Sequence, residues 1–219
     1  MEQANVPFIL DQQNTVGSQF IAELRDVNIQ TDRLRFRRNM ERIGEILAYE
    51  ISKSFNYEPV DVQTPLGIDR SMKMADFPIL ITIMRAGLPL HQGFLNYFDR
   101  ADSGFVGAYR KKGNADEVEI DMHYVATSSI EGRNVILIDP MLATGSSLVR
   151  AYQGLLANGK PAQIHIAAAI ASAPGVNYIA AEIPECKFWL GAVDPELDSR
   201  FYIIPGLGDA GDLSYGPKL

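Results

Sequence analysis

The chain has 219 residues, a hydrophobic content of 47% and a net charge of −7. This length and composition predict one self-sufficient domain, and the negative charge argues against DNA or RNA as general partners. The first residues lack a basic leader, and the longest nearly apolar run, residues 164–171, is shorter than the roughly 20 residues that span a bilayer. We therefore expect a soluble, cytoplasmic protein without membrane partners.

Cysteine and histidine are scarce in this chain. A single cysteine, Cys186, excludes an internal disulfide, and we expect it to be an inert thiol in the core. The three histidines, His91, His123 and His165, are scattered without the spacing of zinc ligands. The sequence therefore predicts no metal site built from protein ligands.

The N-terminal part predicts an arm followed by a long helix. Residues 1–30 are polar and rich in Gln and Asn, and Thr31 is placed to cap a helix that reaches about Phe55. Five arginines cluster where this helix starts: Arg33, Arg35, Arg37, Arg38 and Arg42. Two interpretations stay open, namely a solvated helix face with Asp32 and Glu41 as partners, or a subunit contact or anionic effector site.

After this helix, short apolar runs alternate with helix-like stretches. We expect strands at residues 79–84, 104–109, 135–139, 164–171 and 188–192, and helices at residues 88–98, 147–158 and 174–183. This alternation predicts an α/β fold with a mainly parallel twisted sheet and helices on both faces. Residues 110–129 are charged and irregular, which is typical of an exposed hairpin.

The strand at residues 135–138 runs into an acid and then a turn of small residues. A buried strand that ends at Ile138 delivers Asp139 to the carboxyl edge of the sheet, where ligands bind in open α/β sheets. Residues 143–147 have little side-chain bulk, so their backbone N–H groups can surround an anion at the start of the next helix. The pattern predicts a loop that binds a phosphate monoester.

The sequence of this loop is Asp139-Pro-Met-Leu-Ala-Thr-Gly145. It resembles the phosphoribosyl diphosphate (PRPP) signature of type I phosphoribosyltransferases, in the form found in the uracil phosphoribosyltransferase family. Met84-Arg-Ala-Gly-Leu88 is similar to that family's pyrophosphate loop. The C-terminal residues 202–212 resemble its uracil-binding segment, and Ala108-Tyr-Arg110 lies between these matches in family order. The resemblance implies a type I phosphoribosyltransferase fold with a small hood, formed by residues 193–219, and a flexible β-hairpin at residues 110–129 that closes over the reacting centre.

The resemblance also implies residue roles. Arg85, Asp139 and Asp209 become the candidate catalytic residues. The candidate PRPP-binding residues are Arg85, Ala86, Gly87, Arg110, Asp139, Pro140, Met141, Leu142, Ala143, Thr144, Gly145, Ser146, Ser147 and Asp209. The candidate uracil-binding residues are Ile203, Gly208, Asp209 and Ala210. Mg²⁺ normally accompanies pyrophosphate and is held mainly by substrate oxygens, so few protein ligands are expected.

Three further expectations follow from the resemblance. A cis peptide that does not involve proline is expected near Arg85–Ala86, as in related pyrophosphate loops. The protein is expected to form a homodimer or a higher homo-oligomer, and GTP is a possible effector. Ser146 stands where the bacterial pattern often has a second glycine, and we expect an altered fit to the phosphate, with binding retained.

Alternatives to a uracil enzyme stay open. The same fold could use another base, or it could sense PRPP or uracil nucleotides without turnover. Gly206 to Gly211 also satisfies the dinucleotide pattern G-x-G-x-x-G, but too few residues follow it for the helix and acid that this motif requires. His91 could be considered as a general base, although a histidine on a helix face is more often structural.

Overall fold

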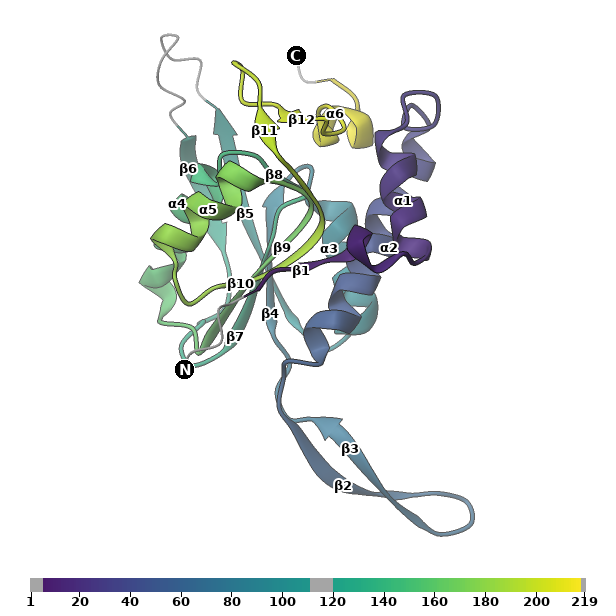
Figure 1. Cartoon of the computed structure of the whole chain (residues 1–219). Helices are drawn as coiled ribbons and strands as arrows, with labels where there is room; N and C mark the ends of the chain where they lie inside the picture. The colour runs from purple at the N-terminus through teal and green to yellow at the C-terminus, as the bar shows by residue number, and fades with distance from the viewer. Residues whose placement is uncertain (1–5, 111–119, 218–219) are drawn as a thin grey trace.

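The computed structural model describes residues 6–110 and 120–217, and it shows one sheet between two groups of helices (Figure 1). The described strands are β1 (Phe8–Ile9), β2 (Tyr57–Gln63), β3 (Ile68–Met74), β4 (Ile79–Met84), β5 (Asp102–Arg110), β6 (Ile120–Ala126), β7 (Asn134–Ile138), β8 (Met141–Leu142), β9 (Gln163–Ser172), β10 (Lys187–Asp194), β11 (Glu196–Leu197) and β12 (Ile203–Ile204). The helices are η1 (Leu10–Gln13), α1 (Val16–Arg25), α2 (Arg33–Ser52), α3 (Leu88–Tyr97), α4 (Ser146–Leu155), η2 (Leu156–Asn158), α5 (Ala173–Glu182) and α6 (Ala210–Tyr215).

The main sheet confirms the predicted α/β class. Its strand order is β1-β10-β9-β7-β4-β5-β6, and β8 pairs with β9 beside this path. Every neighbouring pair in that order is parallel except β5 and β6, which are antiparallel. The carboxyl ends of β4, β7 and β9 therefore meet at one edge, where ligand sites of such sheets form.

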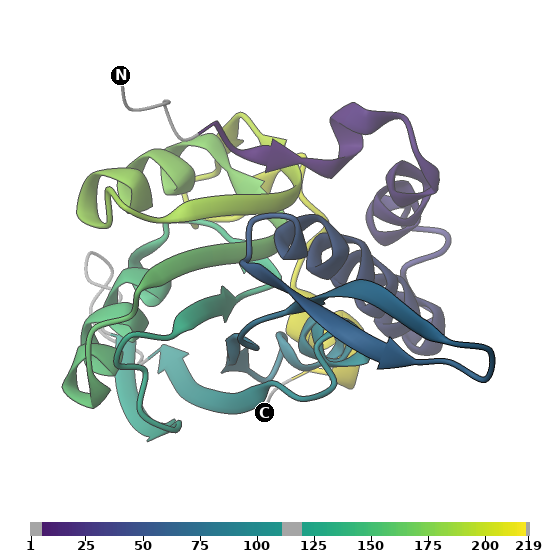
Figure 2. The same cartoon turned by 90° about the horizontal axis from the view of Figure 1, so that it is seen from below.

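Each face of the sheet buries its own hydrophobic core. Alternate residues of β7 point to opposite faces, so Ile136 and Ile138 pack with α1, α2 and α3, while Val135 and Leu137 pack with α4 and α5. Figure 2 shows the sheet between these two helix groups. Because both faces are covered, the central strands are continuous apolar runs, and this is why the sequence located them well.

The N-terminal region differs from the expected polar arm. Phe8 and Ile9 form a parallel edge strand against Trp189 and Leu190 of β10, and α1 then packs on α2. The long helix begins at Arg33 and is capped by Asp32, whose side chain accepts hydrogen bonds from the amides of Leu34 and Arg35. The predicted cap at Thr31 was therefore wrong by one residue, since Asp32 has the same capping chemistry one position later.

Two hairpins leave the body of the sheet. The strands β2 and β3 form a separate two-stranded ribbon that projects away from the rest of the chain (Figure 1), and sequence patterning did not predict it. The expected mobile hairpin at residues 110–129 begins at the end of β5 and contains β6, and its residues 111–119 lie outside the described part of the chain. Within residues 6–110 and 120–217, no helix has both the length and the apolar content to cross a membrane.

Candidate active site

Asp139 lies at the carboxyl end of β7, between the ends of β4 and β9. Its amide donates to the carbonyl oxygen of Ala167 at 3.0 Å, and its Oδ1 accepts a bond of 3.3 Å from the Met141 amide. Burial raises the pKa of Asp139 to about 7, and the Met141 amide opposes this rise only in part. Near neutral pH a carboxyl group with this pKa is present both as a carboxylate, which accepts hydrogen bonds, and as a carboxylic acid, which can donate one.

The loop that follows turns sharply into α4. Gly145 has a φ of 79°, a left-handed conformation that favours glycine, and it is the residue before the helix starts at Ser146. The Oγ1 of Thr144 lies 2.8 Å from the Oγ of Ser146 and accepts a 3.3 Å hydrogen bond from the Ser146 amide. Amides in the first turn of a helix lack partners within the helix, so this loop offers N–H groups to an anion.

The end of β9 supports the loop from below. Ser172 donates a 2.6 Å hydrogen bond from Oγ to the carbonyl oxygen of Ala143 and accepts one of 2.9 Å from the amide of Gly175. Ser172 is fully buried, so the bond is shielded from water. Sequence reasoning missed this residue, because a serine at the end of an apolar strand carries no signal of its partner 29 residues away.

The second predicted loop connects β4 to α3 and lies beside the first. A Cβ on Gly87 would lie 3.4 Å from the carbonyl oxygen of Ile138, and Thr82 Oγ1 donates to that same oxygen at 3.2 Å. The amide of Gly87 donates to Ile83 at 3.1 Å. The cis peptide joins Met84 and Arg85, so it was predicted in the correct loop but one bond too late.

The C-terminal hood supplies the third predicted segment. The strand β12 leads through residues 205–209 into α6, and Asp209 caps this helix by accepting a 3.0 Å bond from the amide of Asp212. The side chains of Ile203 and Ala210 are buried in the core, whereas Gly208 is exposed and has a φ of 97°. Ile203 and Ala210 can therefore reach a ligand mainly through their backbone groups.

Arg85 brings the hood and the β4–α3 loop together. Its Nη2 donates to the carbonyl oxygen of Gly216 at 3.3 Å and lies 3.9 Å from Oδ1 of Asp212, and its guanidinium lies 6.0 Å from the ring centre of Tyr215. The side chain remains 42% exposed. The structure thus places Asp139, Arg85 and the start of α6 at the same edge of the molecule, as Figure 1 shows for the elements that carry them.

Comparison with known proteins decides the family. The family model described as uracil phosphoribosyltransferase matches residues 12–217. This chain belongs to the uracil phosphoribosyltransferase family. The match covers the body of the sheet, the loops that contain Arg85 and Asp139, and the hood.

Full-length relatives agree with this assignment. The chain is 50% identical over 211 residues to a uracil phosphoribosyltransferase from Porphyromonas gingivalis, covering 96% of this chain and 98% of the relative. It is 35% identical to a uracil phosphoribosyltransferase from Thermococcus gammatolerans over 97% of this chain and 91% of the relative. The solved structure of the AQ2163 protein from Aquifex aeolicus superposes with a TM-score of 0.85 at 30% identity, covering 97% and 100% of the two chains.

Arg110, another residue expected to bind PRPP in a uracil phosphoribosyltransferase, is located only in part. Arg110 ends β5, opposite Ile120 of β6 and three residues beyond Gly107, which pairs with Met84. This position puts its backbone near the site edge, while its side chain lies outside the described part of the chain. In the described ranges, no three His, Cys, Asp or Glu side chains gather in a way that could hold a metal ion.

His91 and the glycine pattern of the hood are structural. His91 is buried in α3 with Nε2 at 3.2 Å from Ser103 Oγ, and burial lowers its pKa to about 4, so the ring is neutral near pH 7 and inaccessible to a substrate. Gly206 to Gly211 leads only into α6, which ends at Tyr215. A dinucleotide-binding unit would need a longer helix there and a parallel strand before the pattern, whereas β12 pairs antiparallel with β11 outside the main sheet, so that alternative is excluded.

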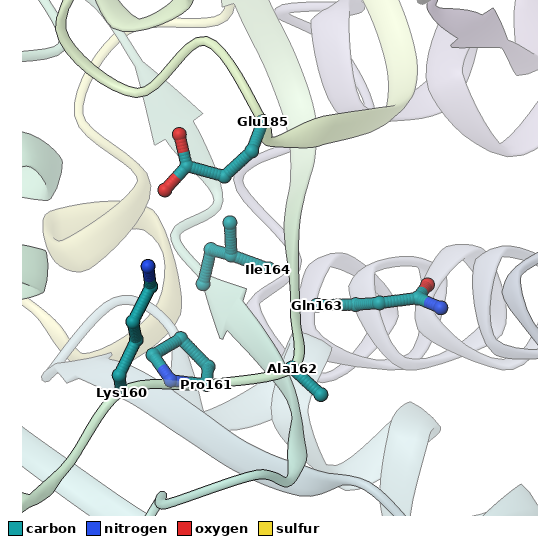
Figure 3. Close-up of a pocket in the computed structure, with 6 residues that line it drawn as sticks. All are labelled: Lys160, Pro161, Ala162, Gln163, Ile164 and Glu185. Atoms are coloured by element: carbon teal, nitrogen blue, oxygen red, sulfur yellow. The ribbon is translucent and has the colours of Figure 1, made fainter.

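A shallow cavity of about 420 Å³ lies far from this edge. Lys160, Pro161, Ala162, Gln163, Ile164 and Glu185 line it, at the amino end of β9 (Figure 3). The ten residues of β9 separate it from Ser172, and a strand of this length extends about 33 Å. In Figure 3 the side chains of Lys160, Ile164 and Glu185 lie on one side of the strand, while Gln163 points to the other side.

Proposed function

We propose that this protein transfers the phosphoribosyl group of PRPP to uracil and releases UMP and pyrophosphate. Membership of the uracil phosphoribosyltransferase family along residues 12–217 carries this proposal. The meeting of three predicted segments at one sheet edge supports it, because a substrate with a phosphate, a ribose and a pyrophosphate needs several separate contacts.

The phosphate loop and Asp139 bind the sugar end of PRPP in this proposal. The residues from Ala143 to Ser147 supply amides and hydroxyls to the 5′-phosphate, in the turn that Pro140, Met141 and Leu142 shape before them. Asp139 accepts hydrogen bonds from the ribose hydroxyls. Ser146 contributes a hydroxyl oriented by Thr144, and its amide exchanges the weak 3.3 Å bond to Thr144 for one to the phosphate. Remote binding of the phosphate then holds the anomeric carbon in place for reaction.

The pyrophosphate end of PRPP binds at the β4–α3 loop. Arg85 offers a planar fork that can bond phosphate oxygens bidentately, and the amide of Ala86 adds a donor. Gly87 lets the backbone come close to the pyrophosphate because it has no side chain, but it adds no hydrogen-bond donor, since its amide already bonds to Ile83. Arg110 joins from the end of β5. These cations stabilise the negative charge that grows on the leaving group in the transition state.

Mg²⁺ fits this arrangement as an ion that arrives with the substrate. The nearby acids Asp139 and Asp209 stand singly at the ends of different elements, so they do not form a protein cage. Mg²⁺ keeps several waters and takes phosphate oxygens readily, with one or two carboxylates at most. Once bound, the ion would neutralise charge on the pyrophosphate.

Uracil binds at the hood in this proposal. Backbone groups of Ile203, Gly208 and Ala210 match its donor and acceptor edge, and Asp209 lies toward PRPP. A pocket built from backbone and glycine leaves little width, which disfavours purines. The transition state has oxocarbenium character, as in glycoside hydrolysis, so the base needs orientation more than a strong general base.

The partners follow from exposed surfaces and family resemblance. The hairpin of β2 and β3 exposes apolar side chains, with Leu66 at 100%, Ile68 at 70% and Met72 at 60% relative exposure. An isolated two-stranded ribbon is only marginally stable in water, which supports a homodimer or larger homo-oligomer. We also propose a cytoplasmic location and test GTP as an effector by adding it to the assay below.

The decisive experiment measures UMP formation from uracil and PRPP, with and without Mg²⁺, beside cytosine, hypoxanthine and adenine. UMP formed with uracil alone and dependent on Mg²⁺ supports the proposal. Product with another base instead changes the substrate. PRPP binding without any product would show a sensor in place of an enzyme.

A further inference from the structure

Arg25 and Asp194 form a forked ion pair between two distant parts of the chain. Arg25 is the last residue of α1, and Asp194 is the last residue of β10. Nη1 and Nη2 of Arg25 lie 2.7 and 2.8 Å from Oδ2 and Oδ1 of Asp194. Asp194 is only 5% exposed and the Arg25 side chain 22%, so the carboxylate end of the pair is shielded from solvent. Bidentate pairs of this kind fix orientation as well as distance.

The same pair holds both polar groups of Gly206. Nη1 of Arg25 donates to the Gly206 carbonyl oxygen at 3.0 Å, and the Gly206 amide donates to Oδ2 of Asp194 at 2.8 Å. Gly206 has a φ of 58°, and a Cβ there would lie 2.1 Å from the carbonyl oxygen of Ile203. The turn therefore requires glycine, and two side chains from outside the hood define its orientation.

The restrained turn lies directly before the base-binding segment. Leu207, Gly208, Asp209 and Ala210 follow Gly206, and Ile203 precedes it. Among the described residues, the side-chain hydrogen bonds of Arg25 and Asp194 run to each other and to Gly206, and none reaches the phosphate loop or Arg85. The backbone of Asp194 pairs with Ser172 of β9, which bonds to Ala143 of the phosphate loop, but side-chain substitutions leave this backbone pairing in place. The two side chains themselves therefore reach the proposed binding segments only through the Gly206 turn.

We propose that Arg25, through Asp194, is a positioning residue for the base site: it fixes the Gly206 turn and so sets the affinity for uracil without contacting either substrate. This inference rests on the proposed binding of uracil at residues 203–210. It assigns the pair a role in recognition beyond joining α1 to the sheet.

The test compares Arg25→Lys and Asp194→Asn with the parent enzyme. Lysine keeps the charge but loses the fork, so the Gly206 turn should loosen while the fold survives. We expect the KM for uracil to rise about 10-fold or more, since small misplacements of a substrate have effects of this size, with the KM for PRPP changed less than about 2-fold. In the double variant the KM for uracil should rise no further than in the more affected single variant, because both substitutions break the same ion pair.

Arg35→Lys is the matched control. Arg35 of α2 makes an equivalent fork with Glu23 of α1, at 2.9 and 2.8 Å, and does not reach the hood. It should lower thermal stability, by less than Arg25→Lys because the Arg35 side chain is 49% exposed and that of Arg25 only 22%, and leave both KM values unchanged. Equal rises of the uracil and PRPP constants in Arg25→Lys, or no change in either constant, would overturn the inference.

A separate variant tests the base site itself. Gly208→Ala places a side chain on an exposed left-handed residue within the proposed uracil segment. If Gly208→Ala raises the uracil KM and Arg25→Lys does not, the base site stands and the positioning role fails. If Gly208→Ala leaves uracil binding unchanged, the proposed base site itself is wrong, and the inference fails with it.

Discussion

Arg85 donates a hydrogen bond from Nη2 to the carbonyl oxygen of Gly216, across 131 residues of sequence. This bond joins the proposed pyrophosphate loop to the segment that follows α6. Its length of 3.3 Å and the 42% exposure of the Arg85 side chain indicate a weak contact that a phosphate oxygen can replace. In the proposed binding mode, one guanidinium therefore couples the binding of pyrophosphate to the position of the hood.

Arg85→Ala should reduce turnover severely and leave the fold intact. The change removes a fork that stabilises charge on the leaving group, and losses of one such donor are typically about 100-fold to 1,000-fold in kcat. Because the side chain is 42% exposed and makes one weak hydrogen bond, stability should change little. Steady-state UMP formation and thermal unfolding measure the two effects.

Arg133→Ala serves as the control for this variant. Its side chain is 37% exposed, and it bonds to the Phe77 carbonyl oxygen at 3.1 Å, beside the amino ends of the strands. The variant should keep the parent's kcat. If Arg85→Ala also kept normal turnover, the pyrophosphate would have to bind elsewhere.

Protonation of Asp139 should lower the kcat/KM for PRPP as the pH falls below about 7. Its pKa is raised by burial to about 7, so the carboxylate that accepts ribose hydroxyls is lost as the pH falls below this value. The kcat/KM for PRPP reports groups of the free enzyme and should fall up to about tenfold per pH unit there. A profile between pH 5.5 and 9 measures it.

Asp139→Asn separates this titration from that of the substrate. The amide does not titrate, so the variant should have a lower kcat/KM whose remaining pH dependence is that of the PRPP phosphates alone, near pH 6. An acid limb at pH 7 that persists in the variant would assign the titration to another group.

The central strands and the turn between Asp139 and α4 could be predicted because local sequence specifies them. The strand at residues 79–84 was placed at both ends as the structure has it, since its apolar run is buried on both faces. Asp139 marks the end of a strand and Gly145 marks a turn, and both lie within one stretch of seven residues. Such signals need no knowledge of distant partners.

The missed features depend on partners far along the chain or on exposed strands. The strand β1 has two residues and exists only through its pairing with β10. The hairpin of β2 and β3 buries little, and its apolar–polar alternation is short, as in Val60-Asp61-Val62 and Met72-Lys73-Met74. This is less than the run that identifies a half-buried strand. Arg25 and Asp194 lie 169 positions apart, and no spacing rule connects them.

Gly145→Ala should weaken PRPP binding because it disturbs the phosphate loop in two ways. The left-handed φ of 79° strains any side chain, and a new Cβ would lie 2.8 Å from Ile179 Cγ1. Strain of this kind costs on the order of 1–3 kcal/mol. We expect a raised KM for PRPP together with a lower melting temperature.

Gly132→Ala isolates the contribution of backbone strain. Gly132 has a similar φ of 66°, and nothing lies within 4 Å of its added Cβ. This variant should lose some stability and keep the parent's KM for PRPP. A PRPP constant that rises equally in both variants would attribute the effect to general destabilisation.

His165 should contribute to loss of stability in acid. It is fully buried, and its Nδ1 accepts a 3.0 Å hydrogen bond from Trp189 Nε1. Burial, with a smaller contribution from Lys187, lowers its pKa to about 3. Between pH 6.5 and about 3 the unfolded chain therefore binds a proton at His165 that the folded chain does not bind. The contribution of neutral His165 to the free energy of unfolding is complete above pH 6.5 and is lost as the pH falls toward 3.

His165→Gln provides the test, because an amide oxygen can still accept from Trp189 but does not titrate. The variant should be less stable than the parent at pH 8, since the substitution disturbs a packed core. Its melting temperature should nevertheless fall less between pH 6.5 and pH 4. His91, whose pKa is lowered to about 4, remains in both proteins and contributes equally to their acid sensitivity. Parallel declines in the two proteins would show that a charged His165 is tolerated in the folded state, against the burial that isolates its ring.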